Sequence, residues 1–217
     1  MRGTLIIIVK APVAGRVKTR LGAALGPARA AAMFRVLSAN TLSRASAGPW
    51  RTVLAVDPPG AVAGFENLWP PRFSRIAQMR GDLGARMAAA FALAPPGPVV
   101  IIGADAPGVS ARHIRAAFAA LAGCDAVFGP AEDGGYWLIG LSRRRAVPRL
   151  LGGGLFKNVR WSSPHALADT LAGLPARFRV AMIERLRDLD DGEDFAALGA
   201  RALRRVRPSV AGGGENA

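Results

Sequence analysis

Short apolar segments with the composition of strands alternate along this chain with longer segments that have helical periodicity. Residues 98–103 are almost entirely apolar, whereas Ile114, Phe118 and Leu121 are spaced like the inner face of a helix. Strands that alternate with helices predict an α/β fold, with a mostly parallel sheet covered by helices on both faces. The expected strands are residues 3–9, 52–56, 98–103, 125–129, 136–141 and 178–182, and the expected helices begin at or directly after Pro27, Asp82, Ser110, Ser163 and Asp191.

The length of 217 residues suits one sizeable core, so we expect one domain over residues 1–200 and a basic tail over 201–217. The apolar stretch near the N-terminus ends at Lys10, which makes it too short for a signal peptide, and no apolar stretch is long enough to span a bilayer. We therefore expect a cytoplasmic protein without a membrane partner.

The single cysteine, Cys124, excludes an internal disulfide and a cysteine-rich zinc site, and we expect it to be a buried small hydrophobe.

The formal net charge of +14 raises the possibility of a nucleic-acid partner. Of the 29 basic residues, 26 are arginines, and the excess is spread through the domain as well as the tail. No basic–aromatic motif of an RNA-binding or single-strand-binding module is present. We therefore expect no nucleic-acid partner, because a small phosphate-rich ligand would use the same charge.

The loop directly after the first expected strand is unusually basic. It contains Lys10, Arg16, Lys18 and Arg20, together with Gly15. Ligands of parallel sheets bind beyond the carboxyl ends of the strands, and phosphate oxygens are bound by cations and by exposed backbone N–H groups. The loop lacks the glycine pair of a Walker A motif. It is therefore a candidate phosphate-binding loop, and the alternative is a solvated basic loop.

Carboxylates follow two other expected strands. Asp105 comes at the end of the apolar stretch 99–102, where it could hold a nucleotide-bound Mg²⁺ or Mn²⁺, although Asp and Pro are also common in turns. Residues 129–137 contain two acids followed by Gly134 and Gly135. These glycines would allow close backbone approach to a ligand, and the alternative is a hairpin turn, which Asp-Gly favours.

A third acidic group lies near the C-terminus, because six of the fifteen acids fall between Glu184 and Asp194. Asp191 is the expected N-cap of the last helix. Capping does not explain Asp190, which we predict to be a second metal ligand opposite Asp105.

Three further positions are weaker candidates. Asp82 is expected to begin a helix whose free N–H groups could contact a base or a sugar, although it could equally be only a helix cap. His113 and His165 lack the spacing of a metal site, so we expect structural roles for both. No Gly-x-Ser-x-Gly motif supports serine hydrolysis.

Six ordered motifs within about residues 3–200 carry a resemblance to a known family. They are Lys10-Ala-Pro with Gly15-Arg-Val-Lys-Thr-Arg-Leu, Gly81-Asp-Leu-Gly, Gly103-Ala-Asp-Ala-Pro, Gly129-Pro-Ala-Glu-Asp-Gly-Gly-Tyr, Leu155-Phe-Lys-Asn-Val-Arg-Trp-Ser-Ser and Asp188-Leu-Asp. The chain resembles a bacterial family of the nucleotide-diphospho-sugar transferase superfamily, which has the Rossmann-like glycosyltransferase-A fold. Members are known as radical-SAM/selenodomain-associated transferases or as arsenosugar-biosynthesis glycosyltransferases. It is more distantly similar to phospholactate and molybdenum-cofactor guanylyltransferases.

The resemblance implies an enzyme that uses a nucleotide and a small-molecule acceptor. The basic loop would bind phosphates, Lys18 and Asp105 would be catalytic, and Asp105 and Asp190 would hold Mg²⁺ or Mn²⁺. Because four cations suit a triphosphate, the leading interpretation is nucleotidyl transfer from an NTP to a phosphorylated acceptor. The alternative is glycosyl transfer from a nucleotide-diphosphate sugar, and a nucleic-acid-binding protein is a remote third.

The sequence departs from the family pattern at two positions. Ala104 stands where the family has Thr or Ser, which removes only a hydroxyl. Asp191 stands where the family has Thr, so either Asp190 or Asp191 could be the second metal ligand. No matched carboxylate is lost.

Overall fold

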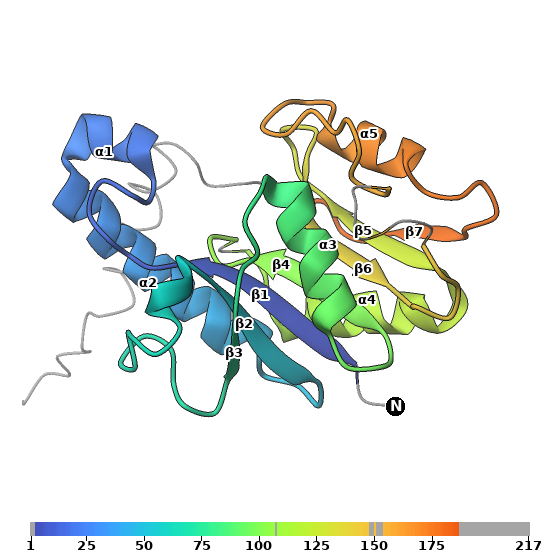
Figure 1. Ribbon diagram of the computed structural model, residues 1–217, viewed down its shortest axis with the longest axis horizontal. Helices are drawn as coiled ribbons and strands as arrows, with labels where there is room; N and C mark the ends of the chain where they lie inside the picture. The colour runs from blue at the N-terminus through green and yellow to red at the C-terminus, as the bar shows by residue number, and fades with distance from the viewer. Residues whose placement is uncertain (1–2, 107, 148–149, 151–153, 187–217) are drawn as a thin grey trace, which may run out of the picture.

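A seven-stranded sheet in the order β3-β2-β1-β4-β6-β5-β7 forms the centre of the protein (Figure 1). The computed structural model describes residues 3–106, 108–147, 150 and 154–186. The strands are β1 (Thr4–Lys10), β2 (Arg51–Asp57), β3 (Ser74–Ala77), β4 (Val99–Gly103), β5 (Ala126–Pro130), β6 (Tyr136–Leu141) and β7 (Val180–Met182). The helices are α1 (Thr19–Leu25), α2 (Pro27–Ala45), the 3-10 turn η1 (Pro59–Ala61), α3 (Leu83–Leu93), α4 (Ala111–Gly123) and α5 (Ala166–Ala172).

The sheet is mostly parallel, as the sequence predicts. β1 pairs in parallel with both β2 and β4, and β2 pairs in parallel with β3. β6 is antiparallel to β4 and β5, so β5 and β6 form a hairpin and the turn interpretation of the acidic Gly-Gly loop is confirmed. β7 lies parallel to β5.

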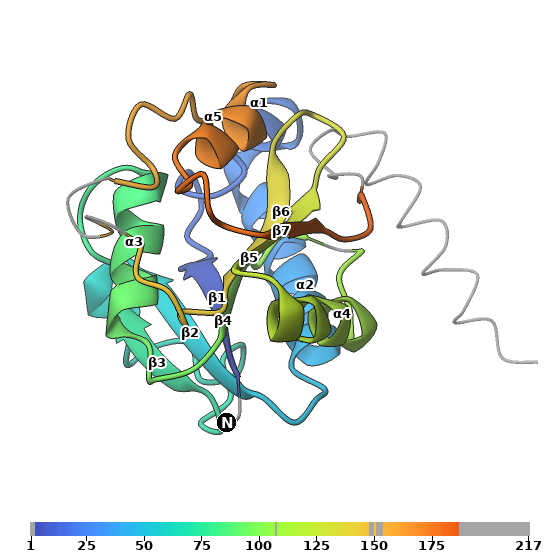
Figure 2. The same ribbon diagram turned by 90° about the vertical axis from the view of Figure 1, so that its right-hand side faces the viewer.

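Both faces of the sheet are buried, which explains why the strands are continuous apolar stretches. Leu5 and Ile7 of β1 belong to the core beneath α2 and α4, whereas Ile6 belongs to the core beneath α3 and α5. Figure 2 shows α3 on one side of the sheet and α2 and α4 on the other. None of the described helices is both long and apolar enough to cross a membrane.

The sequence patterns do not predict β3 and α1. β3 has the sequence Ser-Arg-Ile-Ala without a buried face, and it is a strand because its backbone pairs with β2. Its Arg75 also donates hydrogen bonds to the carbonyl oxygens of Val62, Gly64 and Trp69, which holds the preceding loop. Helix α1 has seven residues, too few for a periodic signal.

Two further predictions need correction, and others fall outside the described residues. α5 begins at Ala166 and not at Ser163, because the Ser163 hydroxyl and the backbone of His165 form a turn first. Cys124 is half-buried at the C-terminus of α4, and not a fully buried hydrophobe. The final helix after Asp191 and the tail 201–217 lie outside the described residues.

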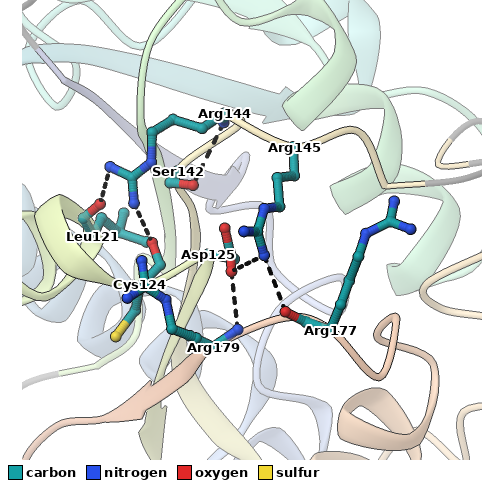
Figure 3. A network of polar contacts seen from close by, with 8 residues as sticks. All are labelled: Leu121, Cys124, Asp125, Ser142, Arg144, Arg145, Arg177 and Arg179. Carbon is teal, nitrogen blue, oxygen red and sulfur yellow. Dashed lines mark hydrogen bonds and ion pairs between the residues drawn. The ribbon is translucent and has the colours of Figure 1, made fainter.

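Part of the arginine excess holds the ends of helices. The Arg144 guanidinium donates to the carbonyl oxygens of Leu121 (2.9 Å) and Cys124 (3.0 Å) at the end of α4 (Figure 3). Arg143 donates to the carbonyl oxygens of Ala94 and Pro95 just after α3. The last carbonyls of a helix lack intrahelical partners, and a planar guanidinium can satisfy several at once, which an ammonium does less well.

Asp125 is the carboxylate at the centre of this network. It is 3% exposed, and its Oδ2 accepts from the backbone N–H of Arg179 (2.9 Å) and from the Arg145 guanidinium (3.3 Å). The pair of contacts ties the start of β5 to the segment that leads into β7 and to the chain after β6 (Figure 3).

We expect Asp125→Ala to lower the free energy of unfolding by about 2 kcal/mol, because it removes a buried carboxylate that accepts from the Arg179 N–H and pairs with Arg145. Urea denaturation measures the change. Glu132→Ala removes an exposed carboxylate and serves as the control, with an expected change within about 0.5 kcal/mol. Equal effects of the two substitutions would contradict the role given to Asp125.

Candidate active site

A cavity of about 440 Å³ lies where β1 and β4 end. Lys10, Arg16 and Lys18 line it from the chain after β1, and Asp105 lines it from the chain after β4. Because β6 is antiparallel to β4, its first residue, Tyr136, reaches the same edge of the sheet and also lines the cavity. The structure therefore brings together residues that are more than a hundred positions apart in the sequence.

An ion pair joins the two predicted catalytic residues. Lys18 Nζ lies 3.1 Å from Asp105 Oδ2, and the Lys18 side chain is 11% exposed while that of Asp105 is 46% exposed. Parallel pairing produces this contact, because Ile8 is in register with Gly103 and both chains continue from there into loops. Of the described residues that line the cavity, three are cations and one is a carboxylate, so the lining attracts anions.

The loop after β1 is held by apolar packing and carries backbone strain. Val17 is buried against Ala31 and Phe34 of α2, which fixes the loop between Arg16 and Lys18. Lys18 has φ 45°, a left-handed conformation that is unfavourable for a residue with a side chain. Such strain persists where the surrounding structure imposes it, and it is concentrated at functional sites. Here it accompanies the approach of Lys18 to Asp105.

Five of the predicted binding residues lie outside the cavity lining. Gly15 has φ +78° in the loop, and Arg20 is exposed on α1. Asp82 caps α3, and its Oδ1 accepts from the backbone N–H of Ala85 at 2.8 Å. The Asp82 carboxylate is therefore engaged at the helix end, although the neighbouring Leu83 does line the cavity.

The other two are Gly134 and Gly135 in the hairpin loop. Gly134 has φ +85°, and a Cβ at this position would lie 2.3 Å from the carbonyl oxygen of Pro164. Its own carbonyl oxygen accepts from the N–H of Leu167 in α5. Packing against the 163–167 segment thus accounts for Gly134 without a ligand.

The predicted second metal ligand, Asp190, and its neighbour Asp191 lie outside the described residues. The described chain ends at Leu186, whose N–H donates to Pro130 O and whose side chain lies 3.5 Å from the position of a Cβ on Gly108. The described chain therefore stops beside the loop that contains Asp105. No three metal-ligating side chains gather anywhere in the described part of the chain.

The buried His113 packs behind Trp137, which lines the cavity. The sequence predicts a structural role for this histidine. His113 Nδ1 accepts from the backbone N–H of Ser110 and so caps α4, while Nε2 faces Glu184 Oε2 at 3.4 Å. Burial, and secondarily the nearby Arg112, lowers the pKa of His113. Its ring packs edge-on against Trp137, which lines the cavity.

The sequence reasoning missed the apolar half of the cavity. Leu83 and Met87 from α3 line this half together with Tyr136. Burial raises the pKa of Tyr136 well above its usual range, so the ring remains neutral. Tyr136 ends one of the six motifs singled out in the sequence, but only the tertiary structure places it opposite α3.

Comparison with known proteins supports a shared fold. The profile of the family described as "Uncharacterized protein conserved in bacteria (DUF2064)" matches residues 41–163. Among solved structures, a protein of Desulfovibrio desulfuricans G20 with the provisional name nucleotide-diphospho-sugar transferase is 29% identical, with a TM-score of 0.80 over 91% of this chain and 87% of its own. No curated protein matches the sequence significantly.

More distant structures share the fold at lower identity. Rv0371c from Mycobacterium tuberculosis H37Rv, in complex with manganese, is 17% identical with a TM-score of 0.53, and the match covers 91% of this chain and 98% of that one. A CMP:2-keto-3-deoxy-manno-octonic acid synthetase in complex with CTP is 10% identical with a TM-score of 0.55, and the match covers 95% and 100%. The fold class predicted from the sequence is therefore confirmed.

We expect Gly134→Ala to destabilise the protein by about 2 kcal/mol or more, because alanine would need both a left-handed backbone and space that Pro164 occupies. Gly123→Ala is the matched control, since a Cβ there meets no atom within 4 Å. Thermal denaturation with nucleotide present and absent separates the two roles. If Gly134→Ala kept full stability and lost only ligand binding, the packing explanation would be wrong.

Proposed function

The chain belongs to the DUF2064 family of proteins conserved in bacteria, and we propose that it is a metal-dependent, nucleotide-using transferase. The observation that carries the proposal is the Lys18–Asp105 ion pair in a cation-lined cavity at the carboxyl ends of β1 and β4. This is the edge of a parallel sheet at which ligands bind. The likeness to a nucleotide-diphospho-sugar transferase at 29% identity supports the same assignment.

The phosphates of the nucleotide would bind to the loop after β1. Lys10, Arg16 and Lys18 supply three positive charges at one side of the cavity, and charge-assisted hydrogen bonds to phosphate oxygens are among the strongest in proteins. Arg20, which was expected to join them, lies outside the lining, so three cations and not four carry this step.

The residues at the cavity fit a divalent metal. Asp105 is a half-exposed carboxylate, a hard oxygen donor of the kind that Mg²⁺ and Mn²⁺ prefer, and it already holds a cation in the form of the Lys18 ammonium. Asp190 would be the second ligand, as the family resemblance of the Asp188-Leu-Asp motif implies. Bound there, the metal would neutralise charge on the phosphate oxygens. Lys18, released from Asp105, would donate to a phosphate oxygen.

Within this class we propose nucleotidyl transfer as the leading reaction. Three cations and a metal suit a triphosphate, and the synthetase that shares the fold at 10% identity was solved in complex with CTP, which supports this choice. The reaction would join the α-phosphate of an NTP to a phosphorylated acceptor and release pyrophosphate. Charge stabilisation suffices for this chemistry, which needs no covalent nucleophile from the protein.

Glycosyl transfer is the second candidate, and a separate observation favours it. The solved structure with 29% identity carries the name of a nucleotide-diphospho-sugar transferase. The motif resemblance to radical-SAM/selenodomain-associated transferases points in the same direction. In this reaction the same cations would stabilise a departing nucleoside diphosphate.

A product assay distinguishes the two reactions. For nucleotidyl transfer we expect pyrophosphate release from one of the four NTPs with Mg²⁺ and a panel of phosphorylated acceptors. Release of UDP or GDP from a nucleotide sugar, with no pyrophosphate from any NTP, would reverse the order of the two candidates. Activity in neither assay, together with no nucleotide binding by calorimetry, would refute the transferase proposal.

Two substitutions test the roles of the ion pair. Lys18→Met removes a phosphate-binding cation, so we expect nucleotide affinity to fall about tenfold or more both with and without Mg²⁺. Asp105→Asn removes a metal ligand, so we expect it to abolish only the increase in affinity that Mg²⁺ produces. Calorimetric titration measures both, with circular dichroism as the check on folding. A Mg²⁺ effect that survives Asp105→Asn would refute the metal assignment.

A further inference from the structure

The motif over residues 155–163 has no part in the site described so far, yet it packs beside the cavity. β4 lies between β1 and β6 in the sheet, so Asp105 stands between the cation-bearing loop and Tyr136. A nucleotide held by the loop and by a metal at Asp105 leaves the Tyr136 side of the cavity for the second substrate.

We propose that Tyr136 and the segment 155–163 form the wall of the acceptor site, and that the Arg160–Asp169 ion pair positions this wall. The proposal rests on the proposed function, because only a transferase has an acceptor. Tyr136 would touch the acceptor, whereas Arg160 and Asp169 would act through the residues that follow them.

Close packing places the segment behind residues that line the cavity. The rings of Tyr136 and Trp161 lie 6.4 Å apart at an interplanar angle of 67°, and those of Phe156 and Trp161 lie 6.1 Å apart. At Gly84, in the first turn of α3, a Cβ would lie 2.6 Å from Phe156 Cβ and 2.9 Å from the Trp161 ring. The segment therefore contacts both Tyr136 and the helix whose Leu83 lines the cavity.

The Arg160–Asp169 pair ties this segment to α5 through three hydrogen bonds. Arg160 Nε donates to Asp169 Oδ2 (2.9 Å), Nη2 donates to Oδ1 (2.8 Å), and the backbone N–H of Arg160 donates to Oδ2 (3.0 Å). These bonds hold the pKa of Asp169 well below its usual range, so the pair stays ionised near neutral pH.

Each partner of the pair precedes a residue that touches Tyr136. Trp161 follows Arg160 and packs on the Tyr136 ring. Thr170 follows Asp169, is fully buried, and its Oγ1 lies 3.3 Å from the Tyr136 hydroxyl oxygen. The ion pair therefore joins the two segments that contact Tyr136.

Backbone strain shows that the segment is held in an imposed shape. Asn158 and Ser162, on either side of Arg160, have φ values of 61° and 55°, within the left-handed region. Non-glycine residues adopt this region at a cost that surrounding contacts must offset. The bidentate pair between the two strained positions is such a contact.

The chemistry of this wall indicates the class of acceptor. Leu83, Met87 and Tyr136 line the cavity beside this wall and are uncharged, whereas Lys10, Arg16 and Lys18 lie across Asp105. An acceptor with an uncharged, apolar or aromatic body and an anionic end would place its body against the wall and its anionic end toward the cations.

The experiment uses the fact that Tyr136 is the single tyrosine of the chain. Protein labelled with 3-fluorotyrosine has one fluorine resonance, which reports on this wall alone. Phenyl phosphate supplies an aromatic body with an anionic end, and inorganic phosphate supplies the anionic end only. We expect phenyl phosphate at millimolar concentration to shift the resonance and inorganic phosphate to leave it in place.

Asp169→Asn tests the positioning role, and Glu66→Gln is the control with the same change of charge in the exposed loop before β3. We expect Asp169→Asn to weaken phenyl phosphate binding about tenfold, to broaden the fluorine signal and to leave nucleotide affinity within about twofold. Asp169→Glu should restore part of the loss. Glu66→Gln should change none of these quantities.

Three results would overturn the proposal. They are a fluorine signal that phenyl phosphate does not move, a signal that inorganic phosphate or nucleotide moves equally, and an Asp169→Asn effect no larger than that of Glu66→Gln. Failure of the proposed function would be seen separately as the absence of nucleotide binding, because the fluorine measurement needs no nucleotide.

Discussion

The site depends on the parallel pairing of β1 with β4. Both strands are buried on both faces, so their register is fixed by the packing of Ile7 and Ile102 on one side and Ile6 and Ile101 on the other. Once the register is fixed, the chains after Lys10 and Gly103 must begin at the same edge of the sheet. The contact between Lys18 and Asp105 follows from this pairing, although 87 positions separate them in the sequence.

The ion pair itself has two consequences for ligand binding. The Lys18 ammonium pairs with Asp105, so the carboxylate does not face the cavity as an isolated charge. In the proposed complex, Lys18 would bind a phosphate oxygen and Asp105 would bind the divalent cation, so each charge would keep a partner of opposite sign. The left-handed backbone at Lys18 is consistent with a residue whose position is imposed by the loop and not by its own preference.

The net charge of +14 divides into several uses in the structure. Three cations line the cavity, where they favour an anionic ligand. Others act as scaffold: Arg75 binds three backbone carbonyls, Arg144 binds the end of α4, and Arg160 binds Asp169. A guanidinium can form several hydrogen bonds in one plane, so arginine suits these positions better than lysine. The charge is therefore only in part a signal of ligand binding.

The sequence determined the fold class and the strands with strong apolar content, because a strand buried on both faces must be apolar and a helix on a sheet must be periodic. It also singled out Lys18 and Asp105 as candidates, because cations and a carboxylate follow strands that end at the edge where parallel sheets bind ligands. It could not identify β3, whose four residues carry no pattern and depend on pairing with β2.

Only the tertiary structure decided which candidates share one cavity. It placed Asp82 at a helix cap and Gly134 against Pro164, although their sequence signals are equally compatible with ligand binding. It also brought Tyr136 beside the cavity, because β6 runs antiparallel and so begins where β4 ends. The local sequence shows which chemistry a side chain offers, whereas the order and direction of the strands determine which side chains come into contact.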